Sequence, residues 1–145
     1  MKIEIDQSGK IENTNIRTIV AFSNAKNRTV IVSSREKLKI QKYFRQIGKR
    51  KVFIYRTFAT LIYFLTKNEK NIQQMIIDLE YPGQEHLIKN YLLKLFNRKN
   101  HRFDRNDITF DVVGKKSRAH QAAIVAYRKN RADVRVISSD IIKLI

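Results

Sequence analysis

The order in which hydrophobic periodicity changes along the chain constrains its fold most strongly. Period-two alternation or β-branched apolar residues mark three early segments, 2–6, 17–23 and 28–33, and each segment predicts a strand. Residues 24–27 form a short polar turn between the second and third segments, which indicates a hairpin. Because no helical pattern separates the three segments, we expect them to form an antiparallel meander.

After this meander the chain alternates between helical and strand patterns. We predict a helix capped by Ser34 and ended by Gly48, an apolar buried helix over 52–65, a strand over 74–80, a helix over 84–97, a strand over 108–113, a helix capped by Ser117, a short strand over 134–137 and a short helix or tail from Asp140. Such alternation favours right-handed parallel crossovers. The expected fold class is therefore α/β, a single domain over 1–145 whose mixed sheet is flanked by helices.

Charge and composition indicate the partner. The chain has 30 Lys and Arg against 13 Asp and Glu, a net charge of +17, which favours nucleic acid over an anionic membrane surface; a generally basic proteome is the alternative. The absence of cysteine excludes disulfides and thiolate chemistry. No signal peptide pattern is visible, and the apolar stretch 58–65 is shorter than the roughly 20 residues of a membrane span. We therefore expect a cytoplasmic protein without membrane contact.

Two acidic motifs stand at the ends of predicted strands. The first, Ile3-Glu-Ile-Asp-Gln-Ser-Gly9, resembles the opening strand of the RNase-H-like superfamily, which includes RNase H, RuvC-type resolvases, transposases and retroviral integrases. The second, Ile76-Ile-Asp-Leu-Glu80, is placed like the family's fourth strand. The resemblance implies that the first and fourth strands are parallel neighbours. It also implies phosphodiester hydrolysis at two Mg²⁺ or Mn²⁺ ions held by carboxylates.

The resemblance also implies roles for individual residues. Asp6 would bridge both metals, and either Asp78 or Glu80, which share a face of their strand, would be a second ligand. Glu36 is an alternative ligand, although a favourable charge on its helix dipole explains it better. The helix over 115–129 lacks the acid that the family places there. The last ligand is left open among His120, which could also act as general acid or base, and two later acids, Asp111 and Asp140.

Basic clusters are the predicted contacts to nucleic acid. Segment 35–56 holds nine Lys and Arg residues, Lys37 among them, and one acid; we expect its aromatic residues in the core and its charges on phosphates. The residues predicted to bind there are Lys42, Arg45, Lys49, Arg50 and Lys51. A second cluster, Lys115, Lys116 and Arg118, opens a helix whose dipole favours an anion. A third basic stretch, 98–105, is expected to be a loop.

Two functions fit these features. The first is a metal-dependent endonuclease that cuts DNA or RNA, with a structured or branched substrate as one option, and with Asp6, Asp78, Glu80 and His120 as catalytic residues. Its metal ligands would be Asp6, Asp78, Glu80 and Asp111. The second is a non-catalytic nucleic-acid-binding or ribonucleoprotein module of the same fold. A homodimer is one possible assembly, because the resolvases that the chain resembles act as dimers.

Overall fold

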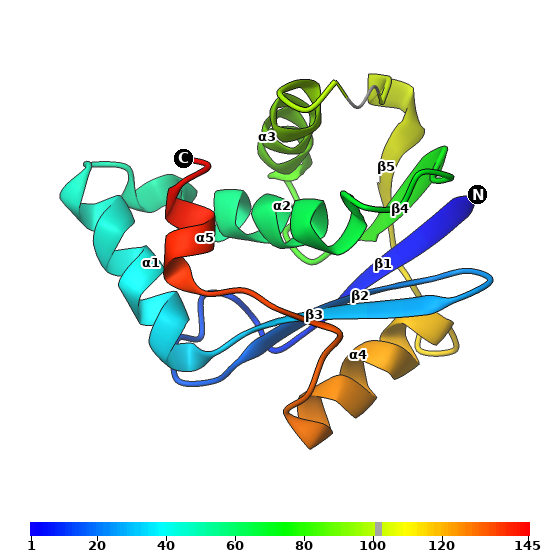
Figure 1. Cartoon of the computed structure of the whole chain (residues 1–145), viewed down its shortest axis with the longest axis horizontal. Helices are drawn as coiled ribbons and strands as arrows, with labels where there is room; N and C mark the ends of the chain where they lie inside the picture. The colour runs from blue at the N-terminus through cyan, green and yellow to red at the C-terminus, as the bar shows by residue number, and fades with distance from the viewer. Residues whose placement is uncertain (101–102) are drawn as a thin grey trace.

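A mixed β-sheet forms the centre of the computed structural model, which describes residues 1–100 and 103–145 (Figure 1). Six strands in these described residues are arranged in the order β5-β4-β1-β2-β3-β6. The strands are β1 (Lys2–Ser8), β2 (Thr18–Ser23), β3 (Asn27–Val32), β4 (Gln74–Asp78), β5 (Ile108–Asp111) and β6 (Val134–Arg135). The predicted basic loop at 98–105 includes residues 101–102, which lie outside the described residues.

The direction of the strands follows the prediction. β1 pairs with β2, and β2 with β3, in antiparallel fashion. β4 is parallel to β1, β5 is parallel to β4, and β6 is parallel to β3. The meander and the later parallel units are therefore both present, and β1 lies at the junction between them.

Three strands end two residues earlier than the sequence pattern predicted. β4 ends at Asp78 rather than at residue 80, because the amide of Glu80 turns back and donates to the Asp78 carbonyl at 2.9 Å. β5 ends at Asp111 rather than at residue 113, because the amide of Val112 donates to the Asp111 side chain instead of to the ladder. The last strand, β6, has only two residues. A local hydrogen bond ends β4 and β5, and β6 is limited to the two residues that pair with β3. Hydrophobic periodicity shows none of these limits.

Helices cover both faces of the sheet. Their bounds are α1 (Ser34–Gln46), α2 (Phe53–Thr66), α3 (Glu85–Asn97), α4 (Arg118–Lys129) and α5 (Ser138–Ile142). Ser33, not the predicted Ser34, caps α1 by accepting a hydrogen bond from the Glu36 amide. Ser117 caps α4 as predicted, and its hydroxyl accepts from the Ala119 amide. None of the described helices has the length and apolar character that crossing a membrane requires.

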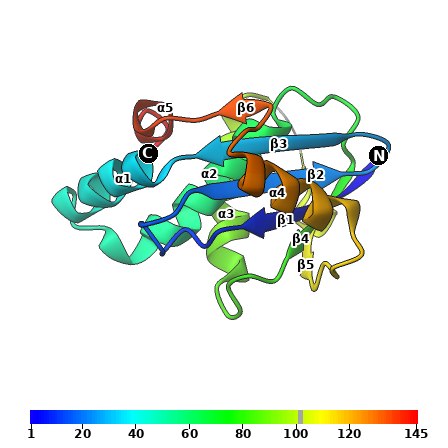
Figure 2. The ribbon, with the colours of Figure 1, turned by 90° about the horizontal axis from the view of Figure 1, so that it is seen from below.

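The two faces carry cores of different size. On the larger side, α2 lies across the sheet with α1, α3 and α5 around it (Figures 1 and 2), and Ile3, Ile5 and Phe58 are among its fully buried residues. On the other side α4 packs alone, with Ala123 and Ala126 against residues of β2 and β3. Its small side chains suit close packing of a helix on a sheet.

Lys37 is completely buried, although the sequence placed it among the charges expected on phosphates. Its ammonium donates to the carbonyl oxygens of Lys10 and Asn13 and to the hydroxyl of Thr18. Burial lowers the pKa of Lys37 to about 8. Lys37, on α1, therefore holds the loop that connects β1 to β2 against this helix. It is not part of the basic surface.

Candidate metal centre

The sheet brings Asp6 and Asp78 together at the carboxyl ends of two neighbouring parallel strands. In the register of β1 and β4, Ile5 lies opposite Ile77, so the next residues along, Asp6 and Asp78, are also neighbours. Side chains alternate across a strand. Because Ile5 and Ile77 point into the larger core, both aspartates project from the opposite face, on which α4 packs.

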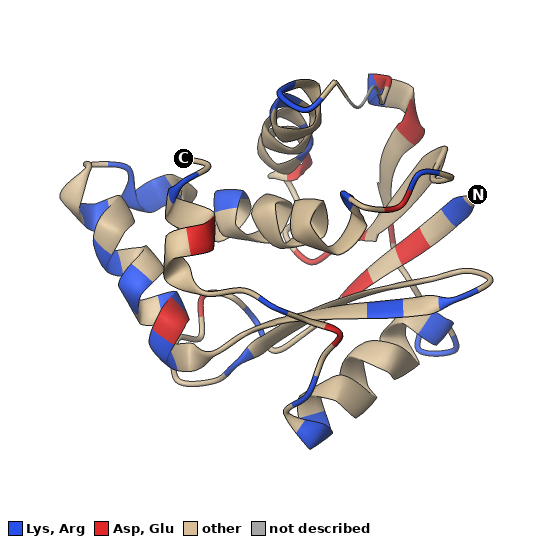
Figure 3. Cartoon of the chain, in the orientation of Figure 1, with Lys and Arg blue, Asp and Glu red and all other residues tan. Residues whose placement is uncertain are grey.

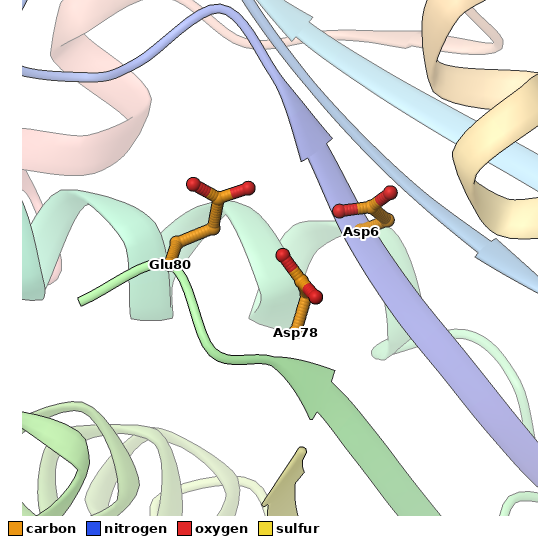
Figure 4. Close-up of side chains that lie close together, drawn as sticks. All are labelled: Asp6, Asp78 and Glu80. Atoms are coloured by element: carbon orange, nitrogen blue, oxygen red, sulfur yellow. The ribbon is translucent and has the colours of Figure 1, made fainter. Parts of the chain in front are cut away.

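Glu80 reaches the same place from outside the strand. It lies two residues beyond the end of β4, in the turn that follows. One carboxylate oxygen from each of Asp6, Asp78 and Glu80 lies within 4.8 Å of the others, and Figure 4 shows the three carboxylates facing one another. The structure therefore brings together both acids of the second motif with Asp6 of the first.

Backbone amides hold two of these carboxylates in position. Oδ1 of Asp6 accepts from the Gln7 amide at 2.8 Å, and Oδ1 of Asp78 accepts from the Val113 amide at 2.7 Å. Asp6 is only 3% exposed. These contacts fix two acids before any ligand is bound, which is the preorganisation that a metal site needs.

The cluster is electrostatically unfavourable when all its carboxylates are charged. Burial raises the pKa of Asp6, and the charge of Asp78 adds to this effect, while hydrogen bonds from Gln7 and His120 oppose it. Burial raises the pKa of Glu80 to about 7, and a hydrogen bond with Asp78 and the charges of Asp78 and Asp6 contribute. A proton or a cation relieves such repulsion. Three converging carboxylates are the hard oxygen ligands that Mg²⁺ and Mn²⁺ prefer, so the residues fit a divalent ion.

His120 contacts this cluster from α4. It lies in the first turn of the helix, and its Nδ1 is 2.7 Å from Oδ2 of Asp6. The side chain is 25% exposed. The imidazole therefore touches the cluster on one edge and reaches solvent, in the position that the family's last ligand was expected to fill.

Asp111 is placed beside the cluster but not in it. In the register of β4 and β5 it lies opposite Asp78. Its side chain is exposed and accepts a hydrogen bond from the next amide, that of Val112. Among the described residues, the group of acids that could share one ion consists of Asp6, Asp78 and Glu80. The predicted assignment of Asp111 as a ligand is not supported by this arrangement.

The remaining candidate acids have structural roles at helix ends. Asp140 accepts from the Ile137 amide at the start of α5. Glu36 accepts from both the amide and the hydroxyl of Ser138, and it pairs with Lys39. These contacts, led by the Ser138 amide, lower the pKa of Glu36 to about 2. Both acids therefore fasten α5, and neither belongs to the cluster of Asp6, Asp78 and Glu80.

Tyr81 is a residue of this site that the sequence did not reveal. It immediately follows Glu80, and its buried hydroxyl lies 3.1 Å from the side-chain nitrogen of Gln7 and 3.2 Å from a carboxylate oxygen of Glu12. The sequence offered 81–86 either as a turn or as a loop at the rim of the site, and it gave no role to the hydroxyl of Tyr81. The contact with Gln7 joins β1 to the segment that follows β4, and so holds the two acidic motifs together.

The predicted nucleic-acid contacts are on the surface. Five of them are exposed at the end of α1 and in the turn before α2, namely Lys42, Arg45, Lys49, Arg50 and Lys51; Figure 3 shows this concentration of basic residues. Four of these residues line one pocket of about 540 Å³. The other three, Lys115, Lys116 and Arg118, are exposed where α4 begins, within five residues of His120 along the chain.

Comparison with known proteins identifies no relative of this chain. No protein-family model matches it, and neither a curated protein nor a solved structure shows significant similarity to it.

Proposed function

We propose that this protein is a metal-dependent nuclease that hydrolyses phosphodiester bonds in DNA or RNA. The observation that carries the proposal is the convergence of Asp6, Asp78 and Glu80 within 4.8 Å, with His120 hydrogen-bonded to Asp6. In a chain with 30 cations and 13 acids, three buried or half-buried carboxylates in contact are costly unless they serve a ligand.

The topology supports an RNase-H-like assignment. β1 has an antiparallel neighbour on one side and a parallel neighbour, β4, on the other. The acids lie at the carboxyl ends of β1 and β4, where the resemblance of the two motifs implied that they would meet. We therefore propose that the sheet belongs to the RNase-H-like type.

Each group of the site has a proposed role. Asp6, Asp78 and Glu80 would hold divalent ions, which stabilise the attacking and leaving oxygens of phosphodiester hydrolysis when bound. His120 would donate Nδ1–H to Asp6, which leaves Nε2 to transfer a proton to or from the reacting groups. Lys115, Lys116 and Arg118 would bind the scissile phosphate or the phosphate next to it, and the dipole of α4 would favour the same anion.

The exposed charges of the α1–α2 turn support nucleic acid as the substrate. Five cations there provide contacts to a phosphate backbone that do not depend on sequence. Since these residues are separate from the carboxylates along the chain, binding and cleavage should be separable by mutation.

The test is a cleavage assay with labelled duplex, hybrid and branched substrates, with Mg²⁺ or Mn²⁺ and then with EDTA. We expect metal-dependent cleavage that is lost in Asp6→Asn and Asp78→Asn, while both variants still bind the substrate. Glu69→Gln is a matched control. Glu69 precedes β4, at the end of that strand opposite to the acids, and pairs with Lys26. Cleavage that persists in EDTA or in Asp6→Asn would overturn the proposal.

One observation favours a second function. Asp111, the further acid that the sequence offered as a ligand, is exposed and is not in the group of acids that could share one ion, so within the described residues that group has three carboxylates. A chain with too few ligands would bind nucleic acid without cutting it. Salt-sensitive binding without cleavage under any metal would establish this non-catalytic role.

A further inference from the structure

A polar pocket of about 630 Å³ lies on the face of the sheet from which Asp6 and Asp78 project, and Glu4 and Ile76 of the same two strands line it. Glu4 on β1 forms part of its floor, and it lies opposite Ser23 of β2 and Ile76 of β4, which also line the pocket. Two residues further along the same strands are Asp6 and Asp78. Two residues of a strand span about 7 Å, so the pocket begins one pleat repeat from the acids.

The wall of this pocket is cationic. It consists of Lys2 and Asn24 on one side and Lys116, Ser117 and Arg118, where α4 begins, on the other. Three cations face a single carboxylate, that of Glu4. The Ser117 hydroxyl donates to Glu4 at 3.2 Å, which leaves the two cations that flank Ser117 for an anionic ligand.

The pocket has a polarity of its own. Its α4 side carries positive charge and the positive end of a helix dipole, which attract a phosphate. Its floor carries the Glu4 carboxylate, which repels a phosphate but accepts hydrogen bonds from hydroxyl or N–H groups. A ligand with a phosphate at one end and a sugar and base at the other satisfies both sides, and the volume suits a ligand of that size.

We propose that this pocket binds one nucleotide of the strand that is cut, the one next to the phosphate held at Asp6, Asp78 and Glu80. The inference rests on the proposed nuclease function and adds a subsite to it. The phosphate of this nucleotide contacts Lys116 and Arg118, and its sugar or base lies over Glu4. One pleat repeat separates the pocket from the acids, a step comparable with one nucleotide of an extended strand.

The test uses ¹⁵N-labelled, metal-free protein in EDTA, titrated with a nucleoside 5′-monophosphate and, in parallel, with inorganic phosphate. We expect the nucleotide to shift the amide signals of Ser23 and Ile76 on the pocket floor and of Asn24 in its wall. The double variant Lys116→Ala/Arg118→Ala should bind the nucleotide at least tenfold more weakly, which corresponds to about 1.4 kcal/mol. Both side chains are exposed, so the variant is expected to fold, and its thermal unfolding is measured alongside.

Arg128→Ala/Lys129→Ala is the matched control, since it removes two exposed charges from the other end of α4. We expect it to change the nucleotide affinity less than twofold. A second variant, Glu4→Gln, should alter the affinity for the nucleotide but leave that for inorganic phosphate unchanged. Equal losses in the two double variants, shifts located elsewhere, or equal affinities for phosphate and nucleotide would each overturn the subsite.

These outcomes are independent of the cleavage test, because the titration needs neither metal nor turnover. Nucleotide binding at the pocket without any cleavage would retain the subsite and reject the nuclease. Cleavage that depends on Asp6 but does not respond to Lys116→Ala/Arg118→Ala, together with no binding in the titration, would reject the subsite alone.

Discussion

Nδ1 of His120 lies 2.7 Å from Oδ2 of Asp6, a residue 114 positions earlier in the chain. This contact joins the first turn of α4 to the end of β1. It distinguishes the cluster from a chance meeting of acids, because it adds a group that can transfer protons to groups that can hold a metal.

The first prediction separates the two uses of His120. His120→Ala and His120→Asn should both lower kcat by about 100-fold, since neither side chain transfers a proton at neutral pH. Asparagine can still donate to Asp6, so only the alanine variant should also weaken metal binding. Single-turnover cleavage and metal titration measure the two effects. His86→Ala, at an exposed histidine on α3, is the control, and unchanged kcat in His120→Asn would exclude a proton-transfer role.

The second prediction concerns pH and Glu80. The folded protein keeps a proton on Glu80 up to about pH 7, whereas the ordinary pKa of the group is 4.5. The free energy of unfolding of the metal-free protein should therefore fall as pH rises from 4.5 to 7. Glu80→Gln, which removes this titration, should flatten the decline, and added Mg²⁺ should restore stability to the unmodified protein above pH 7. Urea unfolding at pH 5 and pH 8 measures both effects, and parallel pH curves for the two proteins would contradict them.

The third prediction tests the basic turn between α1 and α2. Arg45→Ala/Lys49→Ala should weaken duplex binding and reduce the slope of log K against log salt concentration by about 2, if each side chain neutralises one phosphate. The slope is obtained by measuring the binding constant at salt concentrations from about 50 to about 200 mM. Lys67→Ala/Lys70→Ala removes two exposed charges beyond α2 and should leave most of the slope. Identical slopes in the two variants would mean that the turn makes no specific backbone contact.

The fourth prediction concerns the buried lysine. Lys37→Met should destabilise the protein by about 3 kcal/mol, because the carbonyl groups of Lys10 and Asn13 lose their donor in a buried place. Lys39→Met, at an exposed neighbour paired with Glu36, should cost less than 1 kcal/mol. Chemical unfolding of both variants provides the comparison. Equal stabilities would show that water replaces the lost hydrogen bonds.

Local pattern was sufficient to predict the strands that carry the first two acids. Alternation within 2–6 fixes which face Asp6 occupies, and the resemblance to the RNase-H-like superfamily implied that β4 is parallel to β1, as it is in the sheet. The alternation depends only on neighbours in sequence, which is why the sequence was sufficient to predict it.

What the sequence did not predict depends on contacts between distant segments. Lys37 resembles the other cations of its segment, and only the carbonyl groups of the β1–β2 connection make it a buried residue. Asp111 lies opposite Asp78 in the register of β4 and β5, but its side chain is exposed and is not in the group of acids that could share one ion. The position of Glu80 depends on a turn after β4 that hydrophobic alternation does not encode.

The buried alanines of α4 affect the geometry of the site, although they take no part in its chemistry. Ala119, Ala123 and Ala126 are buried between the helix and the sheet, so a single layer of methyl groups sets how near the helix axis lies to β1. The distance between the His120 imidazole and the Asp6 carboxylate therefore depends on these alanine side chains, which lie outside the site itself. A bulkier residue in this layer would push α4 outward and so move His120 away from Asp6, although no residue of the site had been changed.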